Sequence, residues 1–176
     1  MNEKVILILK MGGAIEGYNI NDPDANDKDR YIIDEYFKTS IKPHFRYRIE
    51  SVVEKDSRQI TEKDREKLLY AIKTAPECNI LIPHGTYTMI ETAQYLQQNM
   101  VANVKRILLT GSMTPLEEAN SDAGFNLGFA IGALSVLKTG GIYVCMHGRV
   151  FKKLDHIVKD KKALRFVEGD ADARIV

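Results

Sequence analysis

The segment VILILKMGGAIEGY, residues 5–18, joins a continuous apolar run to a glycine-rich turn. The run Val5–Leu9 has the length and composition of a strand buried on both faces. Gly12 and Gly13 then interrupt it, and Ala14 follows at once. In open α/β sheets, side chains that directly follow a strand lie at the carboxyl edge, where ligands bind. We therefore predict a first buried strand whose end contributes to a ligand site.

The remainder of the chain alternates short apolar runs with longer amphipathic segments. Further strands are predicted at residues 45–53, 79–83, 106–110 and 141–146. Helices are predicted at 31–41, 61–72, 88–98 and 119–137, a polar surface loop at 19–30, and a hairpin within 149–158. This alternation favours an α/β fold, with a doubly wound, mainly parallel sheet of flavodoxin or Rossmann type and helices on both faces.

Length and composition predict one ordinary globular domain over residues 1–176. The chain has 44% hydrophobic and 28% charged residues, and no repeat or linker interrupts it. Its formal net charge is +1, with both signs interspersed. A balanced charge recruits neither nucleic acid nor an acidic membrane, so we expect no partner of either class.

Cysteine and histidine usage predicts a cytoplasmic protein without metal or cofactor. Cys78 and Cys145 flank or occupy apolar runs, as buried reduced thiols do. The N-terminus has no apolar stretch of signal-peptide or membrane-spanning length. His44, His147 and His156 show no metal-ligand spacing.

Three loops follow predicted strands and therefore meet at one edge of the sheet. They are Gly12–Tyr18, Pro83–Met89 (PHGTYTM) and Thr110–Pro115 (TGSMTP). Thr86 or Thr88 has a structural interpretation as a helix cap, and a helix N-terminus also stabilises negative charge. A nucleotide-binding turn is the weaker alternative, because no third glycine follows at dinucleotide spacing and no P-loop lysine is present. Together these loops predict a small-molecule site.

Four ordered motifs resemble the N-terminal domain of the bacterial-type L-asparaginases. They are GGAIEG at 12–17, HGTYTMIETAQYL at 84–96, LLTGSMTPLEEANSDAGFNLGFAIGAL at 108–134 and GIYVCMHGRVF at 141–151. The segment DHIVKDKKALRFVE at 155–168 resembles the ending of the family's short, single-domain branch. The resemblance implies the asparaginase N-terminal fold, hydrolysis of L-asparagine or a related small amide, and a homo-oligomer.

The resemblance also implies roles for individual residues. Thr86 matches a catalytic threonine, and Lys159 matches its lysine on the short-branch spacing, whereas Val158 matches it on the two-domain spacing. Tyr18 matches the tyrosine that closes over the site, and Ser57 matches the serine that holds the substrate carboxylate. The other positions expected to contact substrate are Gly13, Gly85, Tyr87 and Ser112. Backbone N–H groups around Gly85 and Gly111 are expected to stabilise the oxyanion.

Three positions depart from the pattern that the motifs resemble. Ala14 stands where the family's first nucleophilic threonine lies, Tyr87 replaces an aspartate, and Met11 replaces a threonine. The alanine side chain has no oxygen that could attack a substrate, and the tyrosine phenol carries no charge at neutral pH. Three interpretations stay open: an altered enzyme that works through Thr86, a silenced asparaginase, and an amino-acid-binding protein without catalysis. His84 is expected to pack beneath its loop rather than act as a base.

Overall fold

The computed structural model describes residues 5–21, 32–100, 104–160 and 162–169. Within these residues six strands form one sheet in the order β2-β1-β3-β4-β5-β6. The strands are β1 (Ile6–Lys10), β2 (Tyr47–Ser51), β3 (Asn79–Pro83), β4 (Arg106–Thr110), β5 (Gly141–Met146) and β6 (Arg149–Phe151). The first five are parallel and β6 is antiparallel to β5. The order reverses between β1 and β3, which is the point where flavodoxin-like sheets bind ligands.

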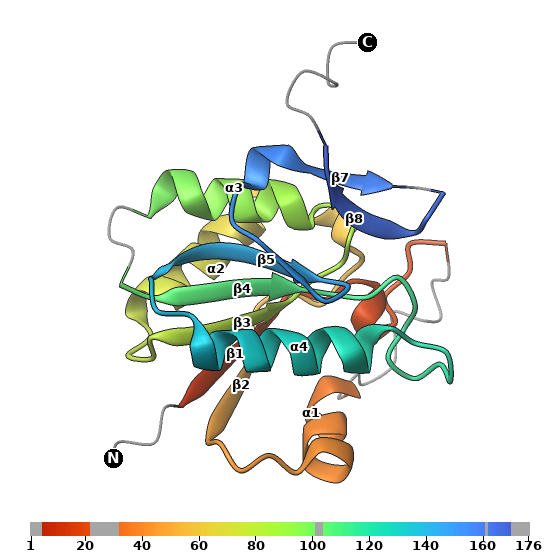
Figure 1. Ribbon diagram of the computed structural model, residues 1–176, viewed down its shortest axis with the longest axis horizontal. Coiled ribbons are helices and arrows are strands. Elements are labelled where there is room, and N and C mark those ends of the chain that lie inside the picture. The colour runs from red at the N-terminus through yellow and green to blue at the C-terminus, as the bar shows by residue number, and fades with distance from the viewer. Residues whose placement is uncertain (1–4, 22–31, 101–103, 161, 170–176) are drawn as a thin grey trace.

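Helices cover both faces of this sheet, as the alternating sequence pattern predicts (Figure 1). On one face lie α2 (Glu62–Thr74) and α3 (Met89–Asn99), whose buried residues join one hydrophobic cluster. On the other lie α1 (Ile32–Tyr36), the π-helical turn Phe37–Ile41 and α4 (Ala123–Val136), which join a second cluster. The predicted doubly wound α/β fold is confirmed.

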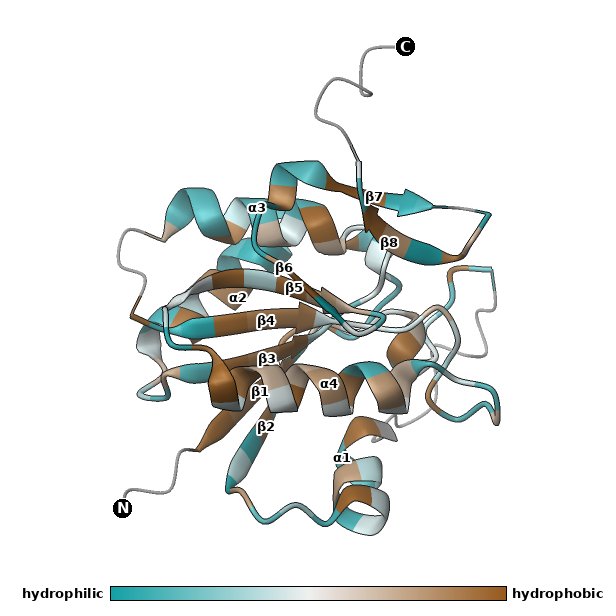
Figure 2. Ribbon diagram, viewed as in Figure 1, coloured by the Kyte–Doolittle hydropathy of each residue, from teal (hydrophilic) through white to brown (hydrophobic). Residues whose placement is uncertain are grey.

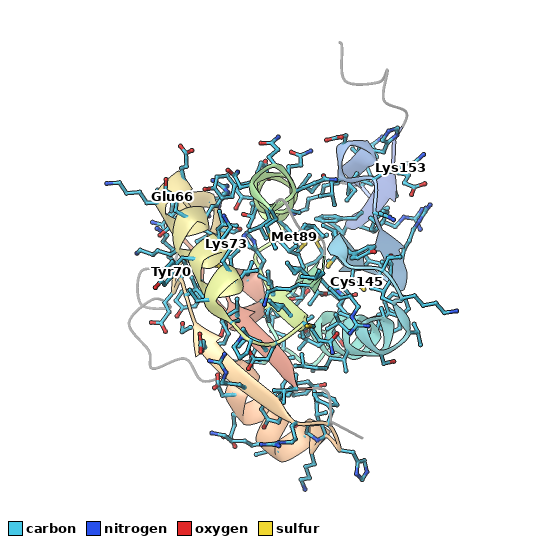
Figure 3. The ribbon with its side chains drawn as sticks, turned by 90° about the vertical axis from the view of Figure 1, so that its left-hand side faces the viewer. Glu66, Tyr70, Lys73, Met89, Cys145 and Lys153 are labelled. Carbon is cyan, nitrogen blue, oxygen red and sulfur yellow. The ribbon has the colours of Figure 1, made fainter. Side chains whose placement is uncertain are left out.

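The apolar runs become the central strands because both of their faces are covered. All residues of β1, β3 and β5 are buried, and Figure 2 shows the hydrophobic residues gathered on the middle of the sheet. Figure 3 labels Met89 and Cys145, which belong to the two different clusters, and shows Glu66 and Tyr70 on the outer side of α2. In the part of the chain that the structure describes, the half-polar β2 lies at the edge of the sheet and pairs only with β1.

Several local predictions needed correction. The helix expected at 119–137 begins at Ala123, because Glu118 and Ser121 donate backbone hydrogen bonds within preceding turns. Cys78 is exposed, so the prediction of two buried thiols holds only for Cys145. The polar loop expected at 19–30 lies largely outside the described residues.

The prediction of a hairpin within 149–158 was wrong. Its residues instead contribute to two other hairpins, in which β6 pairs with β5 and a later strand pairs with the strand that follows it. β6 turns back onto β5 through His147 (φ 53) and Gly148 (φ 78), and two consecutive positive-φ residues favour a tight hairpin turn. Further along, β7 (Ile157–Asp160) pairs with β8 (Arg165–Glu168) in a separate two-stranded sheet. Figure 1 shows this β7–β8 hairpin beside β5, near the end of the sheet where the parallel strands finish.

No helix among the described residues is both long and apolar enough to cross a membrane.

Candidate active site

A cavity of about 460 Å³ opens at the carboxyl edge of the sheet, where the loops after β1, β2, β3 and β4 meet. Its described lining includes residues from each of these loops: Ala14, Tyr18, Ser57, Thr86, Tyr87 and Met113. Its position at the reversal of strand order is the one expected for a ligand site in this fold. The structure thus brings together most of the side chains singled out from the sequence.

The loops approach so closely because glycines lie where they cross. A Cβ atom on Gly13, which has φ 84, would lie 2.2 Å from the Cα of Gly85. A Cβ atom on Gly85 would lie 2.3 Å from Ser57 Oγ. Because neither Gly13 nor Gly85 has a side chain, their backbones can touch, and the loops after β1 and β3 meet beside the cavity. Neither belongs to the described lining of the cavity.

Replacing Gly13 with alanine is expected to lower the free energy of unfolding by about 3 kcal/mol or more, because the new methyl group meets backbone atoms and the positive φ is strained. The matched control is Gly128→Ala in α4, where an added Cβ meets no atom within 4 Å. It should stabilise the protein by about 0.5–1 kcal/mol. Chemical denaturation measures both. Equal effects of the two substitutions would contradict this account of Gly13.

The Thr86 hydroxyl is held by a lysine rather than used as a helix cap. Lys159 Nζ donates to Thr86 Oγ1 at 2.8 Å. Lys159 lies on β7 opposite Phe166 of β8, so the β7–β8 hairpin brings its amine to Thr86; Lys159 itself is not in the described lining of the cavity. The neighbouring Val158 is partly exposed. Thr88 occupies the N-cap position of α3, but its hydroxyl donates to the carbonyl oxygen of Ser57 at 2.7 Å.

Ser57 begins a short 3-10 turn, and the residues on either side of it, Asp56 and Arg58, form an ion pair. Asp56 accepts hydrogen bonds from Arg58 N at 2.8 Å, Arg58 Nε at 3.0 Å and Arg58 Nη2 at 2.7 Å, and from Ile20 N at 3.1 Å. Burial opposes ionisation of this carboxyl, but the hydrogen bonds from Arg58 lower the pKa of Asp56 below its usual value. Arg58 thereby becomes a fixed cation in the wall of the cavity. Sequence reasoning did not single it out.

Tyr87 is exposed and lies against two cations. Its ring centroid is 4.8 Å from Arg58 Cζ and 4.5 Å from Lys159 Nζ, within the range of cation–π contacts. Elsewhere in the lining, Ala14 starts a 3-10 turn, and the buried Tyr18 closes that turn by donating from its backbone N to Gly13 O at 3.1 Å. Ala14 therefore faces the same cavity as Thr86.

Ser112 lies outside the described lining of the cavity. It is buried, and its hydroxyl donates to Thr114 O at 2.5 Å. The nearby SDAGFN motif instead anchors this loop. Asp122 accepts from Met113 N at 2.9 Å, and Asn126 donates to Gly111 O at 3.0 Å. These contacts give the motif a positioning role that its side-chain types alone did not reveal. Met11 is buried in the cluster beneath α2 and α3.

His84 packs beneath its loop, as predicted. Its Nδ1 lies 2.8 Å from Gly85 O and its Nε2 lies 2.9 Å from Thr92 Oγ1. A carbonyl only accepts, so Nδ1 carries the proton and Nε2 accepts from the Thr92 hydroxyl. Thr92 in turn accepts from Arg65 Nε at 3.1 Å. Complete burial lowers the pKa of His84 to about 4, so the ring is neutral at pH 7.

The buried His84 predicts a defined loss of stability in acid. Its pKa falls from 6.5 to about 4 on folding, so between these values the unfolded chain binds a proton that the native chain does not. The contribution of the neutral His84 ring to the free energy of unfolding is complete above pH 6.5 and is lost as the pH falls to about 4. The expected loss is about 3 kcal/mol of unfolding free energy.

Denaturation curves between pH 4 and 7 on the wild type and His84→Gln test this expectation. The substitution should remove about one proton from the pH dependence of unfolding. His44→Gln, at an exposed histidine, is the control and should keep the wild-type slope. Identical slopes in wild type and His84→Gln would contradict the assignment.

A buried ion cluster lies under the turn that carries Ala14, and sequence reasoning missed it. Lys10 Nζ is 3.1 Å from Glu16 Oε1 and 2.8 Å from Asp34 Oδ2. Burial raises the pKa of Glu16 above its usual value, although Lys10 opposes this. The sequence did contain a signal for this ion pair. Lys10 ends an apolar strand and Glu16 follows an isoleucine, so two opposite charges flank the glycine-rich turn within apolar surroundings. Among the described residues, no group of three or more His, Cys, Asp or Glu side chains forms a possible metal site.

Comparison with known proteins relates this geometry to one family. The sequence model described as asparaginase, N-terminal, matches residues 5–159. A glutaminase-asparaginase from Acinetobacter glutaminasificans is 34% identical over 106 residues, covering 56% of this chain and 31% of the relative.

Solved structures share the fold. A probable cytoplasmic L-asparaginase from Campylobacter jejuni superposes with a TM-score of 0.75 at 23% identity, covering 94% of this chain and 51% of the other. The thermostable L-asparaginase from Thermococcus kodakarensis gives a TM-score of 0.77 at 25% identity, covering 93% and 51%. This chain therefore spans about half the length of those enzymes. By the extent of the family match, from the first strand through Lys159, the chain belongs to the asparaginase family and corresponds to its N-terminal domain.

Proposed function

We propose that the protein is an amidohydrolase that releases ammonia from a small amide by acyl transfer to Thr86. The observation that carries the proposal is the 2.8 Å contact between Lys159 Nζ and Thr86 Oγ1 at the wall of the cavity. A threonine hydroxyl is a weak nucleophile until a neighbouring base takes its proton. A lysine amine in its neutral form is such a base, and here it lies within hydrogen-bond reach.

The reaction then proceeds in two steps. Lys159 takes the proton of the Thr86 hydroxyl as the oxygen attacks the amide carbonyl carbon, and ammonia leaves after receiving that proton. Water next attacks the resulting ester, which frees the carboxylic acid and restores the Thr86 hydroxyl. We assign stabilisation of the oxyanion to backbone N–H groups of the turn after Gly85, at the N-terminus of α3. Tyr18 and Ser57 serve as substrate contacts.

L-asparagine or a related small amide is the substrate class that the family supports. The relatives named above are called glutaminase-asparaginase and L-asparaginase. We further propose a cytoplasmic location, after the Campylobacter jejuni protein's designation, and a homo-oligomer. A second copy would cover apolar surface such as the stacked rings of Phe125 and Phe129, of which Phe125 is exposed.

The direct test is ammonia release by the purified protein from a panel of small amides, with hydroxylamine added to intercept an ester. The proposal expects ammonia and a hydroxamate product in the same reaction. Mass spectrometry of acid-quenched protein should place the acyl group on the peptide that contains Thr86. Acylation of another residue, or no ammonia from any amide, would overturn the proposal.

A non-catalytic amino-acid-binding protein is the second candidate, and Ala14 is the observation that favours it. The Ala14 side chain that lines the cavity is a methyl group and offers no hydroxyl. If Thr86 is the nucleophile, Ala14→Thr should change kcat for ammonia release by less than about tenfold, since the new hydroxyl is not needed. A protein that is inactive as it stands and gains ammonia release with Ala14→Thr would instead be a silenced asparaginase. Ligand-dependent thermal stabilisation without turnover in either protein would favour the binder.

A further inference from the structure

Among the described residues that line the cavity, one of the two carboxylates is already engaged within the protein. Among the described lining residues, the carboxylates are Asp56 and Glu118. Both oxygens of Asp56 already accept hydrogen bonds, three of them from Arg58. Glu118 is exposed and lies on the loop after β4. The carboxylate next to Ser57 in the chain, that of Asp56, is therefore occupied within the protein.

Arg58 lines the cavity and keeps one donor group, Nη1, without a partner among the described residues. Its Nε and Nη2 atoms donate to Asp56, and Nη2 also donates to Asn19 Oδ1 at 3.2 Å. Its Nη1 atom donates to no other group among the described residues. The ion pair fixes the guanidinium plane, and a fixed guanidinium with a free Nη1 group is suited to donate to a carboxylate.

A second cation, Lys159, contacts the same cavity-lining ring as Arg58. The ring of Tyr87 contacts both Arg58 Cζ at 4.8 Å and Lys159 Nζ at 4.5 Å. An ammonium group bound beside Tyr87 would therefore face the fixed positive charge of Arg58 and, while its amine is protonated, that of Lys159, and like charges at such distances repel. A carboxylate in the same place would be attracted by both.

We infer that the substrate of this site is a monoamide that carries a carboxylate and no ammonium group, with the carboxylate bound by Arg58 and Ser57. The inference rests on the proposed amidohydrolase activity and names its substrate class as the monoamides of dicarboxylic acids. Succinamate is the natural probe, because it equals asparagine without the α-amino group.

Kinetics on this matched pair test the inference. The wild type should hydrolyse succinamate with a kcat/KM roughly tenfold or more above that for L-asparagine. Arg58→Gln should lower kcat/KM for succinamate by roughly tenfold to a hundredfold, mainly through KM, because a charge-assisted hydrogen bond is lost. The control is Arg48→Gln on β2, where a similar bidentate pair with Glu77 lies outside the cavity lining. It should leave both substrates unchanged.

A binding experiment separates this inference from the proposed activity. Calorimetry with the products, succinate and L-aspartate, requires no turnover. Tighter succinate binding that weakens in Arg58→Gln supports the ligand class, even if no amide releases ammonia and the proposed function fails. Tighter binding of L-aspartate than succinate would overturn the inference. Loss of L-aspartate binding in Glu118→Gln would also overturn it, by showing that Glu118 holds an ammonium group.

Discussion

Replacing Thr86 with alanine is expected to lower ammonia release from the best amide substrate by roughly 10⁴-fold or more, since loss of a nucleophile leaves only binding and electrostatic stabilisation. Thr86 is the hydroxyl that Lys159 contacts at 2.8 Å, and it is largely buried at the cavity wall. Removing its oxygen should abolish the ester intermediate. Binding of the product carboxylate should change little, because Ser57 and Arg58 remain in place.

Two further variants make this expectation specific. Thr86→Ser keeps the hydroxyl and should retain activity within about a hundredfold, whereas a structural role for the methyl group alone would make serine as harmful as alanine. Thr74→Ala removes an exposed hydroxyl at the end of α2, which donates to Tyr70 O at 2.9 Å, and should leave turnover unchanged. Full activity in Thr86→Ala would show that another group attacks the amide.

The central strands were predictable because each is an uninterrupted apolar run bounded by turn residues. Asn79–Pro83, Arg106–Thr110 and Gly141–Met146 were predicted with the bounds that the structure has. Burial on both faces imposes this composition, and intervening helices impose parallel pairing. The start of α4 was predicted too early, because Ala119 and Asn120 favour or tolerate a helix. In the structure Asp122 accepts hydrogen bonds from the backbone of Met113 and Thr114, and the residues before Ala123 stay in a loop.

The β7–β8 hairpin escaped prediction for a different reason. Its strands Ile157–Asp160 and Arg165–Glu168 are short, charged and without strong periodicity. Their pairing is favoured by contacts that no local window contains, such as burial of Phe166 in the cluster with α3. Lys159 was identified through family resemblance, and only the folded hairpin shows the amine reaching a loop 73 residues earlier in the chain.

Arg58 shows which part of a site stays hidden in a sequence. Its type is common at surfaces, and its importance depends on two partners, the adjacent Asp56 and the distant Tyr87. The same holds for Lys10, whose pairing with Asp34 spans 24 positions. Motif spacing identifies residues that act through their own chemistry. Residues that act through a partner become visible only when folding has brought that partner close.

Replacing Lys159 with methionine is expected to lower kcat by roughly 10²- to 10⁴-fold, the range that a positioned general base contributes. Methionine keeps most of the side-chain volume against Tyr87 but cannot take the Thr86 proton. The rising limb of the pH–rate profile, which reports deprotonation of the base, should disappear together with the rate. KM for the amide should change less than kcat, because the interaction is made in the transition state.

The controls distinguish a base from a structural lysine. Lys153→Met replaces an exposed lysine just before the 3-10 turn Leu154–His156, which precedes β7, and should keep both rate and pH profile. Lys159→Arg retains the positive charge near Tyr87 but always stays protonated, so it should be nearly as inactive as methionine. If arginine instead restored turnover, Lys159 would act by its charge alone. Stability measured by denaturation should be similar in both Lys159 variants, because the loss that matters is that of a proton acceptor beside Thr86 Oγ1.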